Sequence, residues 1–260
     1  MTDIHPIKAK LRDGGVALGI NVRLSRSGDI ARIAKASGHD FLFIDAQHAI
    51  YDLQTIGHIA QAAQALGIAP LVRVRSVNDP DITVMLDSCV TGIVFPDVNT
   101  AADARHAVET VRFAPLGRRS LGGSPPQLDF RSMPTDKLME TLNAQTLLVC
   151  MIETMEGLEN VEEIAAIPGI DILHVGSNDL LSDMGKPGQF DCPEIVAAQA
   201  RVTAAARANG LFAGCGGNRD VARQAAAIRG GAQFLTTQTD IAFLMASAAQ
   251  WTDGVRKLLV

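Results

Sequence analysis

The feature that most constrains the fold is an alternation, along the whole chain, of short apolar runs with stretches of helical periodicity. The apolar runs are the expected strands, and they occupy residues 16–22, 41–46, 71–75, 92–96, 146–152, 171–176, 211–215 and 234–238. Between them, apolar residues recur at three- and four-residue spacing, which is typical of amphipathic helices. Strands that alternate with helices and are apolar throughout their length predict a parallel sheet covered on both faces.

Eight such units in a chain of 260 residues match the size of a closed (β/α)₈ barrel, or TIM barrel. A doubly wound open sheet is the competing fold, but it usually carries a Gly-rich dinucleotide loop after its first strand, where this chain has NVRLSRSG. We therefore predict an α/β protein with one barrel domain over residues 1–260. Segment 113–134 is too long and too rich in Pro and Gly for a simple connection, so we interpret it as a functional loop.

Composition excludes several classes of function. A net charge of -5 and a pI near 5.7, with scattered cations, give no basis for binding nucleic acid. No apolar run approaches the ~20 residues of a membrane helix, and the start of the chain lacks the apolar centre of a secretory leader. The four cysteines have no C-x-x-C spacing, so we expect small buried side chains in a reducing cytoplasm: Cys89, Cys150, Cys192 and Cys215.

Polar residues gather where the expected strands end, which is where barrels of this kind carry their chemistry. In strand order these residues are Asp45, Gln47 and His48, then Arg73 and Arg75, then Glu153, then Asn178 and Asp179. Glu153 and Asp179 are one repeat apart, so they lie at similar heights on neighbouring strands ~4.8 Å apart. Either residue alone is more often structural, as an acid that interacts with the helix dipole in the first turn of a helix. Two carboxylates this close repel each other unless a proton or a cation lies between them, so the pair favours a divalent metal site.

Other polar residues have open interpretations. His48 and Arg73 are also one repeat apart and are expected to be neighbours, although His48 alone fits a core histidine and Arg73 alone fits the partner of an acid. We interpret His174, inside the sixth strand, as a satisfied interior histidine. Residues 214–218, GCGGN, fit either a cradle for a phosphate or carboxylate or a tight turn.

Four stretches of the chain, in order, carry a resemblance to a known family: FLFIDAQHAIYD, PLVRVRSVNDP, VCMIETMEGLENVEEIAAIPGIDILHVGSNDLLSDMG and GAQFLTTQTDIAFL. They resemble the HpcH/HpaI class II pyruvate aldolases, metal-dependent enzymes that cleave 4-hydroxy-2-oxo acids into pyruvate and an aldehyde. The resemblance implies a (β/α)₈ barrel. It also implies a homo-oligomer, a hexamer built as a trimer of dimers, whose subunits commonly exchange the last helix.

The resemblance also implies the ligands of the metal ion. Glu153 and Asp179 are the implied protein ligands of Mg²⁺, Mn²⁺ or Co²⁺, and the carboxylate and keto oxygen of pyruvate chelate the same ion. The backbone around Gly176, Ser177 and Asn178 is implied to bind the pyruvate carboxylate.

The implied catalytic residues come from the other side of the barrel mouth. Arg73 is implied to stabilise the enolate oxygen. His48 is implied to act as the base through a water molecule on the ion, with support from Asp45 and Asp87. No lysine lies at any expected strand end, in agreement with a mechanism that uses no Schiff base.

Some positions depart from the family pattern. Gln47 stands where the family usually has Glu, and Met151 stands where it usually has a substrate-contacting Gln, although a thioether donates no hydrogen bond. Arg119 matches an arginine of a family loop and is therefore also implied to bind substrate. Arg118 and Arg23 are additional cations, which suggest an acidic or polar second fragment such as a semialdehyde.

We therefore predict a cytoplasmic, metal-dependent aldolase that reversibly cleaves a 4-hydroxy-2-oxo acid into pyruvate and an aldehyde through a metal-stabilised enolate. Its partners are small molecules and copies of itself, not nucleic acid or membrane. One alternative is an oxaloacetate decarboxylase that uses the same enolate chemistry. The other is a non-catalytic 2-oxo-acid-binding barrel, which the departures at Gln47 and Met151 motivate.

Overall fold

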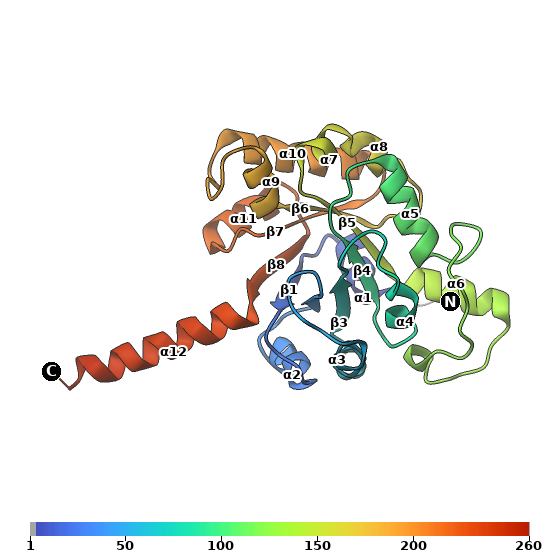
Figure 1. Cartoon of the computed structure of the whole chain (residues 1–260), viewed down its shortest axis with the longest axis horizontal. Helices are drawn as coiled ribbons and strands as arrows, with labels where there is room; N and C mark the ends of the chain where they lie inside the picture. Colours follow the sequence, from blue (N-terminus) through green and yellow to red (C-terminus); the bar gives the residue numbers. More distant parts are fainter. Residues whose placement is uncertain (1–3, 260) are drawn as a thin grey trace.

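The computed structural model describes residues 4–259, which form a closed barrel of eight parallel strands (Figure 1). Each strand pairs with the next in sequence, and the last pairs with the first. The strands are β1 Ala17–Val22, β2 Phe41–Asp45, β3 Ala69–Arg73, β4 Gly92–Phe95, β5 Leu147–Ile152, β6 Ile172–Gly176, β7 Phe212–Gly216 and β8 Phe234–Thr239. The predicted (β/α)₈ barrel is confirmed.

Helices follow every strand and, apart from the last one, pack around the outside of the barrel, with one further helix before the first strand. They are α1 Pro6–Arg12, α2 Asp29–Ala36, α3 Leu53–Ala65, α4 Ile82–Leu86, α5 Ala101–Val111, α6 Thr135–Gln145, α7 Met155–Glu159, α8 Val161–Ala165, α9 Ser177–Asp183, α10 Pro193–Ala208, α11 Val221–Arg229 and α12 Asp240–Lys257. Ile7 and Leu11 of α1 pack against the interior side chains, so this helix closes the amino-terminal end of the barrel.

The barrel interior is filled by apolar side chains at its lower levels. Phe41 and Phe234 stack there with ring centroids 4.2 Å apart. Gly19 of β1 faces this stack, and a Cβ at this position would overlap the Phe41 ring. Along β5, Leu147, Val149 and Met151 belong to the same interior cluster. Because side chains alternate along a strand, the next inward residue is Glu153, so the interior becomes polar where the strand ends.

The bounds of the third strand differ from the expected ones, and the functional role of segment 113–134 remains a prediction. The third strand was expected at residues 71–75 but covers 69–73. Arg75 leaves the sheet because its backbone N–H and guanidinium donate hydrogen bonds to Asp79, and the guanidinium also pairs with Asp81. The long segment 113–134 contains one short 3₁₀ turn, η1 Pro126–Leu128, and forms a small apolar cluster with α6.

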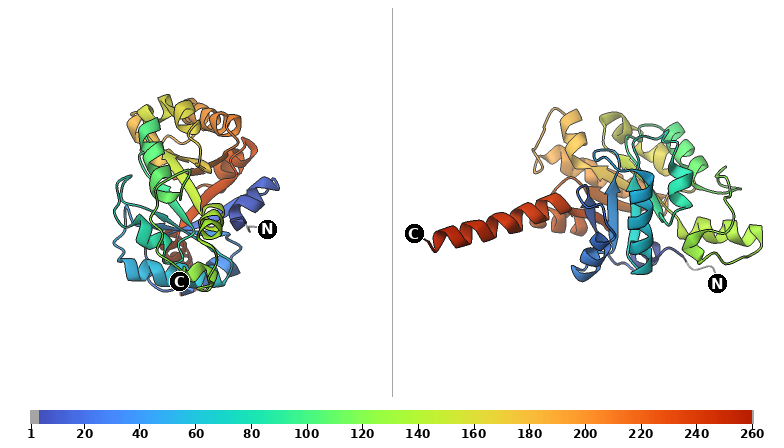
Figure 2. Two further views of the ribbon diagram at one scale, coloured as in Figure 1. Left: turned by 90° about the vertical axis from the view of Figure 1, so that its right-hand side faces the viewer. Right: turned by 60° about the horizontal axis from the view of Figure 1, so that its bottom comes forward.

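Helix α12 leaves the barrel and extends away from it (Figure 2). Its exposed residues include large apolar side chains: Leu244, Met245, Trp251 and Val255. Trp251 is 74% exposed, which is unusual for a side chain with so much apolar surface. No helix within residues 4–259 is both long and apolar enough to cross a membrane.

Candidate active site

Two adjoining cavities open at the carboxyl ends of the strands. The first, here called the mouth cavity, has a volume of about 150 Å³ and is lined by residues that include Arg23, Asp45, Arg73, His174, Asn178 and Arg219. The second, here called the acidic cavity, has a volume of about 410 Å³ and is lined by residues that include Gln47, His48, Asp97, Glu153, Asp179 and Asp183. His48 and Asp179 line both. The structure therefore brings Glu153, Asp179, His48 and Arg73 to one end of the barrel.

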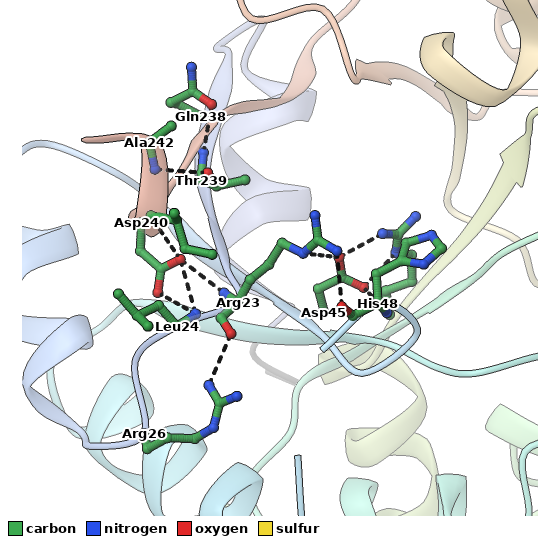
Figure 3. Close-up of polar contacts among 11 residues, drawn as sticks. Arg23, Leu24, Arg26, Asp45, His48, Gln238, Thr239, Asp240 and Ala242 are labelled. Carbon is green, nitrogen blue, oxygen red and sulfur yellow. Dashed lines mark hydrogen bonds and ion pairs between the residues drawn. The ribbon is translucent and has the colours of Figure 1, made fainter. Parts of the chain in front are cut away.

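Asp45 is the anchor of the cationic side of this site. Its carboxylate is fully buried and accepts hydrogen bonds from Arg73 Nε at 3.0 Å and Arg73 Nη2 at 2.7 Å. Arg23 Nε lies 3.3 Å from the same carboxylate, and the backbone N–H of His48 donates to it at 3.2 Å (Figure 3). Asp45 therefore fixes the Arg73 guanidinium and holds the backbone of His48. The Asp45 carboxylate contacts His48 through its backbone N–H.

Glu153 has the opposite environment. It is 2% exposed, its Oε1 accepts a hydrogen bond from the backbone N–H of Asp97 at 2.8 Å, and its buried Oε2 has no partner among residues 4–259. Burial raises the pKa of Glu153 to about 7, and the negative charges of Asp97 and Asp179 contribute in the same direction. A buried acidic oxygen without a donor is costly unless a cation or a proton compensates it.

These features fit a divalent metal ion. Glu153 and Asp179 line one cavity and supply hard oxygen donors, which Mg²⁺ and Mn²⁺ prefer. Within the described part of the chain, no group of three or more His, Cys, Asp or Glu side chains is arranged to hold a metal ion. Glu153 and Asp179 would hold such an ion and leave room for substrate and water to bind it as well.

Asp97 was not among the residues predicted for the site. It follows β4, has a φ of 51°, and lines the acidic cavity beside Glu153. Burial raises the pKa of Asp97, and the charge of Asp179 raises it further. The signal was present in the sequence, because Asp97 ends the fourth apolar run just as Glu153 ends the fifth.

His48, Gln47 and Met151 surround the space between the carboxylates and the arginines. The His48 side chain is exposed to both cavities, and its ring makes no hydrogen bond with the part of the chain that the structure describes. Gln47 Oε1 is buried and also lacks a partner there. Met151 lines the mouth cavity, and its Cε would lie 3.2 Å from a Cβ at Gly176.

Backbone from β6 and β7 forms one wall of the mouth cavity. Gly176 ends β6, and Ser177 and Asn178 open α9. Gly217 has a φ of +84°, and a Cβ there would lie 3.0 Å from the backbone nitrogen of Asn178. The glycine thus leaves space in front of this N–H group, as a carboxylate cradle requires.

Two predicted site residues lie elsewhere. Asp87 caps the end of α4 and accepts a hydrogen bond from Arg119 Nη2 at 2.6 Å. The Arg119 guanidinium lies 4.7 Å from the centre of the Phe113 ring. Neither residue lines the mouth cavity or the acidic cavity. Their assigned roles toward His48 and the substrate stay predictions.

The interpretation of His174 as a satisfied histidine is wrong. Its ring lies in the barrel interior between Phe43 and Phe234, with centroid distances of 6.3 and 5.7 Å. Its Nδ1 is buried and has no hydrogen-bond partner in residues 4–259. Burial, and then the charge of Arg73, lower its pKa to about 3, so the imidazole is neutral.

Comparison with known proteins gives consistent matches. The family model described as "HpcH/HpaI aldolase/citrate lyase" matches residues 23–245. A 4-hydroxy-4-methyl-2-oxoglutarate aldolase of Chaetomium globosum is 35% identical over 99% of this chain and 97% of its own. A hydroxypyruvate/pyruvate aldolase of Rhizorhabdus wittichii is 35% identical over 85% of this chain and 86% of its own. The crystal structure of an HpcH/HpaI aldolase from Desulfitobacterium hafniense superposes with a TM-score of 0.91 at 29% identity, covering 98% of this chain and 97% of that one.

Proposed function

The chain belongs to the HpcH/HpaI aldolase/citrate lyase family, and on this premise we propose that it cleaves a 4-hydroxy-2-oxo acid reversibly into pyruvate and a carbonyl fragment. The predicted family and the predicted class of enzyme, a carbon–carbon lyase, are confirmed by relatives that are named as aldolases. Such relatives argue against the alternative of a non-catalytic binding barrel.

The observation that carries the proposal is the buried Oε2 of Glu153, which has no hydrogen-bond partner in residues 4–259 and shares the acidic cavity with Asp179. We propose these two carboxylates as the ligands of Mg²⁺ or Mn²⁺. When bound, the ion supplies a Lewis acid that polarises the keto oxygen of the substrate. The N–H groups around Gly176, Ser177 and Asn178 would bind the pyruvate carboxylate.

The remaining residues handle charge and protons. Cleavage of the C3–C4 bond leaves negative charge on the keto oxygen of the pyruvate fragment. The guanidinium of Arg73, fixed by two hydrogen bonds to Asp45, places a positive charge at the site where this charge develops. His48 lines both cavities, and its ring, which makes no hydrogen bond within residues 4–259, accepts the proton of the C4 hydroxyl. Phe43 and Met151 contribute apolar side chains to the lining of the mouth cavity.

We further propose that the chain assembles as a homo-oligomer, a hexamer in which subunits exchange α12. The support is the apolar surface of this helix, which the barrel of its own chain leaves exposed. A cytoplasmic location is proposed as well, because the four cysteines are free thiols.

Removal of the metal tests the proposed function. Enzyme stripped with EDTA is expected to release no pyruvate from 4-hydroxy-2-oxo acids, and addition of Mg²⁺ or Mn²⁺ is expected to restore the release. Glu153→Gln keeps an acceptor for the Asp97 N–H but loses the charge, so activity should fall roughly 100-fold or more. Glu156→Gln, an exposed neighbour on α7, is the matched control and should retain activity.

Two outcomes would contradict this proposal. Full activity of exhaustively metal-free enzyme would refute the role of the ion. Release of CO₂ from oxaloacetate, with no carbonyl fragment released from any 4-hydroxy-2-oxo acid, would favour the decarboxylase instead.

A further inference from the structure

The site has walls of opposite charge. Glu153 and Asp179 stand at the ends of β5 and β6 on one side. Arg23 follows β1 and Arg219 follows β7, and both line the mouth cavity. In the closed barrel only β8 separates β7 from β1, so the two arginines come from nearby parts of the rim, and Arg23 shares the Asp45 carboxylate with Arg73 of β3.

Arg219 is an exposed cation at the mouth cavity, and it has no ion-pair partner within residues 4–259. It makes no hydrogen bond or ion pair with the residues that the structure describes, although it lines the mouth cavity. Burial lowers the pKa of Arg219, the positive charge of Arg23 lowers it further, and only Asp45 acts in the opposite direction. Arg23 has Asp45 as its ion-pair partner, whereas no carboxylate within residues 4–259 forms an ion pair with Arg219.

Arg23 is held in place for this position. The carboxylate of Asp240, at the start of α12, accepts hydrogen bonds from the backbone N–H groups of Arg23 and Leu24, both at 3.0 Å (Figure 3). The guanidinium of Arg23 donates from Nη2 to the backbone oxygen of His48 at 2.9 Å. The backbone and the guanidinium of Arg23 are therefore both held by hydrogen bonds, and the side chain lines the mouth cavity.

The arginines that line the mouth cavity outnumber the carboxylates that line it. Arg23, Arg73 and Arg219 face it, whereas Asp45 is shared between Arg23 and Arg73. In the proposed function Asp179 holds the metal ion and so does not neutralise Arg219. The pyruvate carboxylate is also assigned already, to the backbone around Ser177. A second anionic group of the substrate would complete the site.

We propose that Arg219, together with Arg23, binds a carboxylate on the carbonyl fragment, so that the substrate is a dicarboxylic 4-hydroxy-2-oxo acid. This inference rests on the proposed function and defines the substrate class of the same site. The fragment released beside pyruvate is then itself an oxo acid. A guanidinium suits this task because its donors match the two oxygens of a carboxylate.

The test compares two substrates that differ only in this group: 4-hydroxy-4-methyl-2-oxoglutarate, and the analogue in which a methyl group replaces the carboxylate on C4. For Arg219→Gln, kcat/KM for the dicarboxylate should fall roughly 10- to 100-fold, the size of a lost charged hydrogen bond. For the analogue it should change less than about threefold. Arg219→Lys should recover part of the loss, since lysine keeps the positive charge but lacks the two parallel N–H donors of a guanidinium.

Arg223→Gln is the matched control. It removes the same charge four residues further along, but its guanidinium pairs with Asp191 and does not line the mouth cavity. Its kcat/KM should stay near that of the wild type for both substrates. An equal loss on both substrates in Arg219→Gln, or no loss on either, would overturn the inference.

Exchange of the pyruvate methyl protons with D₂O separates this inference from the proposed function, because the exchange needs no second fragment. If Arg219→Gln exchanges the pyruvate protons at the rate of the wild type and also keeps the substrate preference of the wild type, the inference is overturned but the proposed function is not. Absence of both exchange and cleavage in the metal-loaded wild type would refute the proposed function, and the inference with it.

Discussion

At the scale of single residues, the two buried carboxylates Asp45 and Glu153 differ in how many donors and positive charges surround them. Asp45 faces two guanidinium groups and a backbone N–H, so its charge is satisfied within the chain. Glu153 receives one backbone N–H, and its pKa is raised to about 7. Pairs of acids with such different environments generally have different tasks. Asp45 orients arginines, and Glu153 is the residue suited to bind an added cation.

A second consequence at this scale concerns His174 and acid stability. Its folded pKa is about 3 against an ordinary value of 6.5, so between these values the unfolded chain binds a proton that the folded chain does not. Its contribution to stability is therefore intact above pH 6.5 and is lost as the pH falls toward 3. From pH 6.5 to 4.5 this loss is on the order of 2 kcal/mol, because a difference of one full proton between the two states corresponds to about 1.4 kcal/mol per pH unit.

We expect His174→Phe to lose less stability on acidification than the wild type, by about 2 to 3 kcal/mol between pH 7 and pH 4.5. The ring of Phe keeps the contacts with Phe43 and Phe234 and carries no titratable group. Urea unfolding at the two pH values measures the difference. His106→Phe, on the exposed surface of α5, is the control. Equal acid sensitivity of the His174 variant and the wild type would show that His174 is not held neutral.

Much of the site could be predicted from residue types at strand ends, as Glu153, Asp179, His48 and Arg73 show. The rest depends on contacts between segments far apart in sequence. Arg219 follows a Gly-rich turn, and nothing in that turn indicates that its guanidinium enters the mouth cavity. Asp240 holds the backbone that follows β1, a contact across more than 200 residues, which no local pattern encodes.

At the scale of elements, strands are the best predicted parts because a buried strand must be apolar along its whole length. β2 and β5 were expected to within one residue at each end, whereas β3 was displaced because Arg75 pairs with acids of its own loop. Loops lack such a constraint. Asp87 and Arg119 pair with each other in the structure, and only the folded loop shows this.

Helix α12 carries the prediction at this scale. Leu244, Trp251, Val255 and Leu258 lie at helical spacing and are all exposed. In the proposed assembly they are covered by another subunit, so Leu244→Glu with Trp251→Glu should reduce the oligomer to smaller species. Sedimentation velocity measures this. Ala246→Glu with Ala249→Glu, on the opposite face of the helix, is the control. An unchanged mass of the first variant would refute the role of this face.

At the scale of the whole molecule, the barrel separates two charged ends by an apolar interior. At the amino-terminal end, Asp171 pairs with Lys8 at 2.8 Å and with Arg112 at 2.6 Å, far from the cavities. At the carboxyl-terminal end, the acids and arginines face open cavities. The first set is satisfied within the chain and serves the fold, whereas the second is incomplete without a cation and an anion.

The central claim is that this incompleteness is filled by a divalent ion on Glu153 and Asp179. A crystal of the protein grown with Mn²⁺ and pyruvate, with anomalous data collected at the manganese edge, tests it most directly. We predict one strong anomalous peak coordinated by both carboxylates and by pyruvate. A peak that contacts neither carboxylate, or pyruvate bound in the mouth cavity with no metal beside it, would contradict the account.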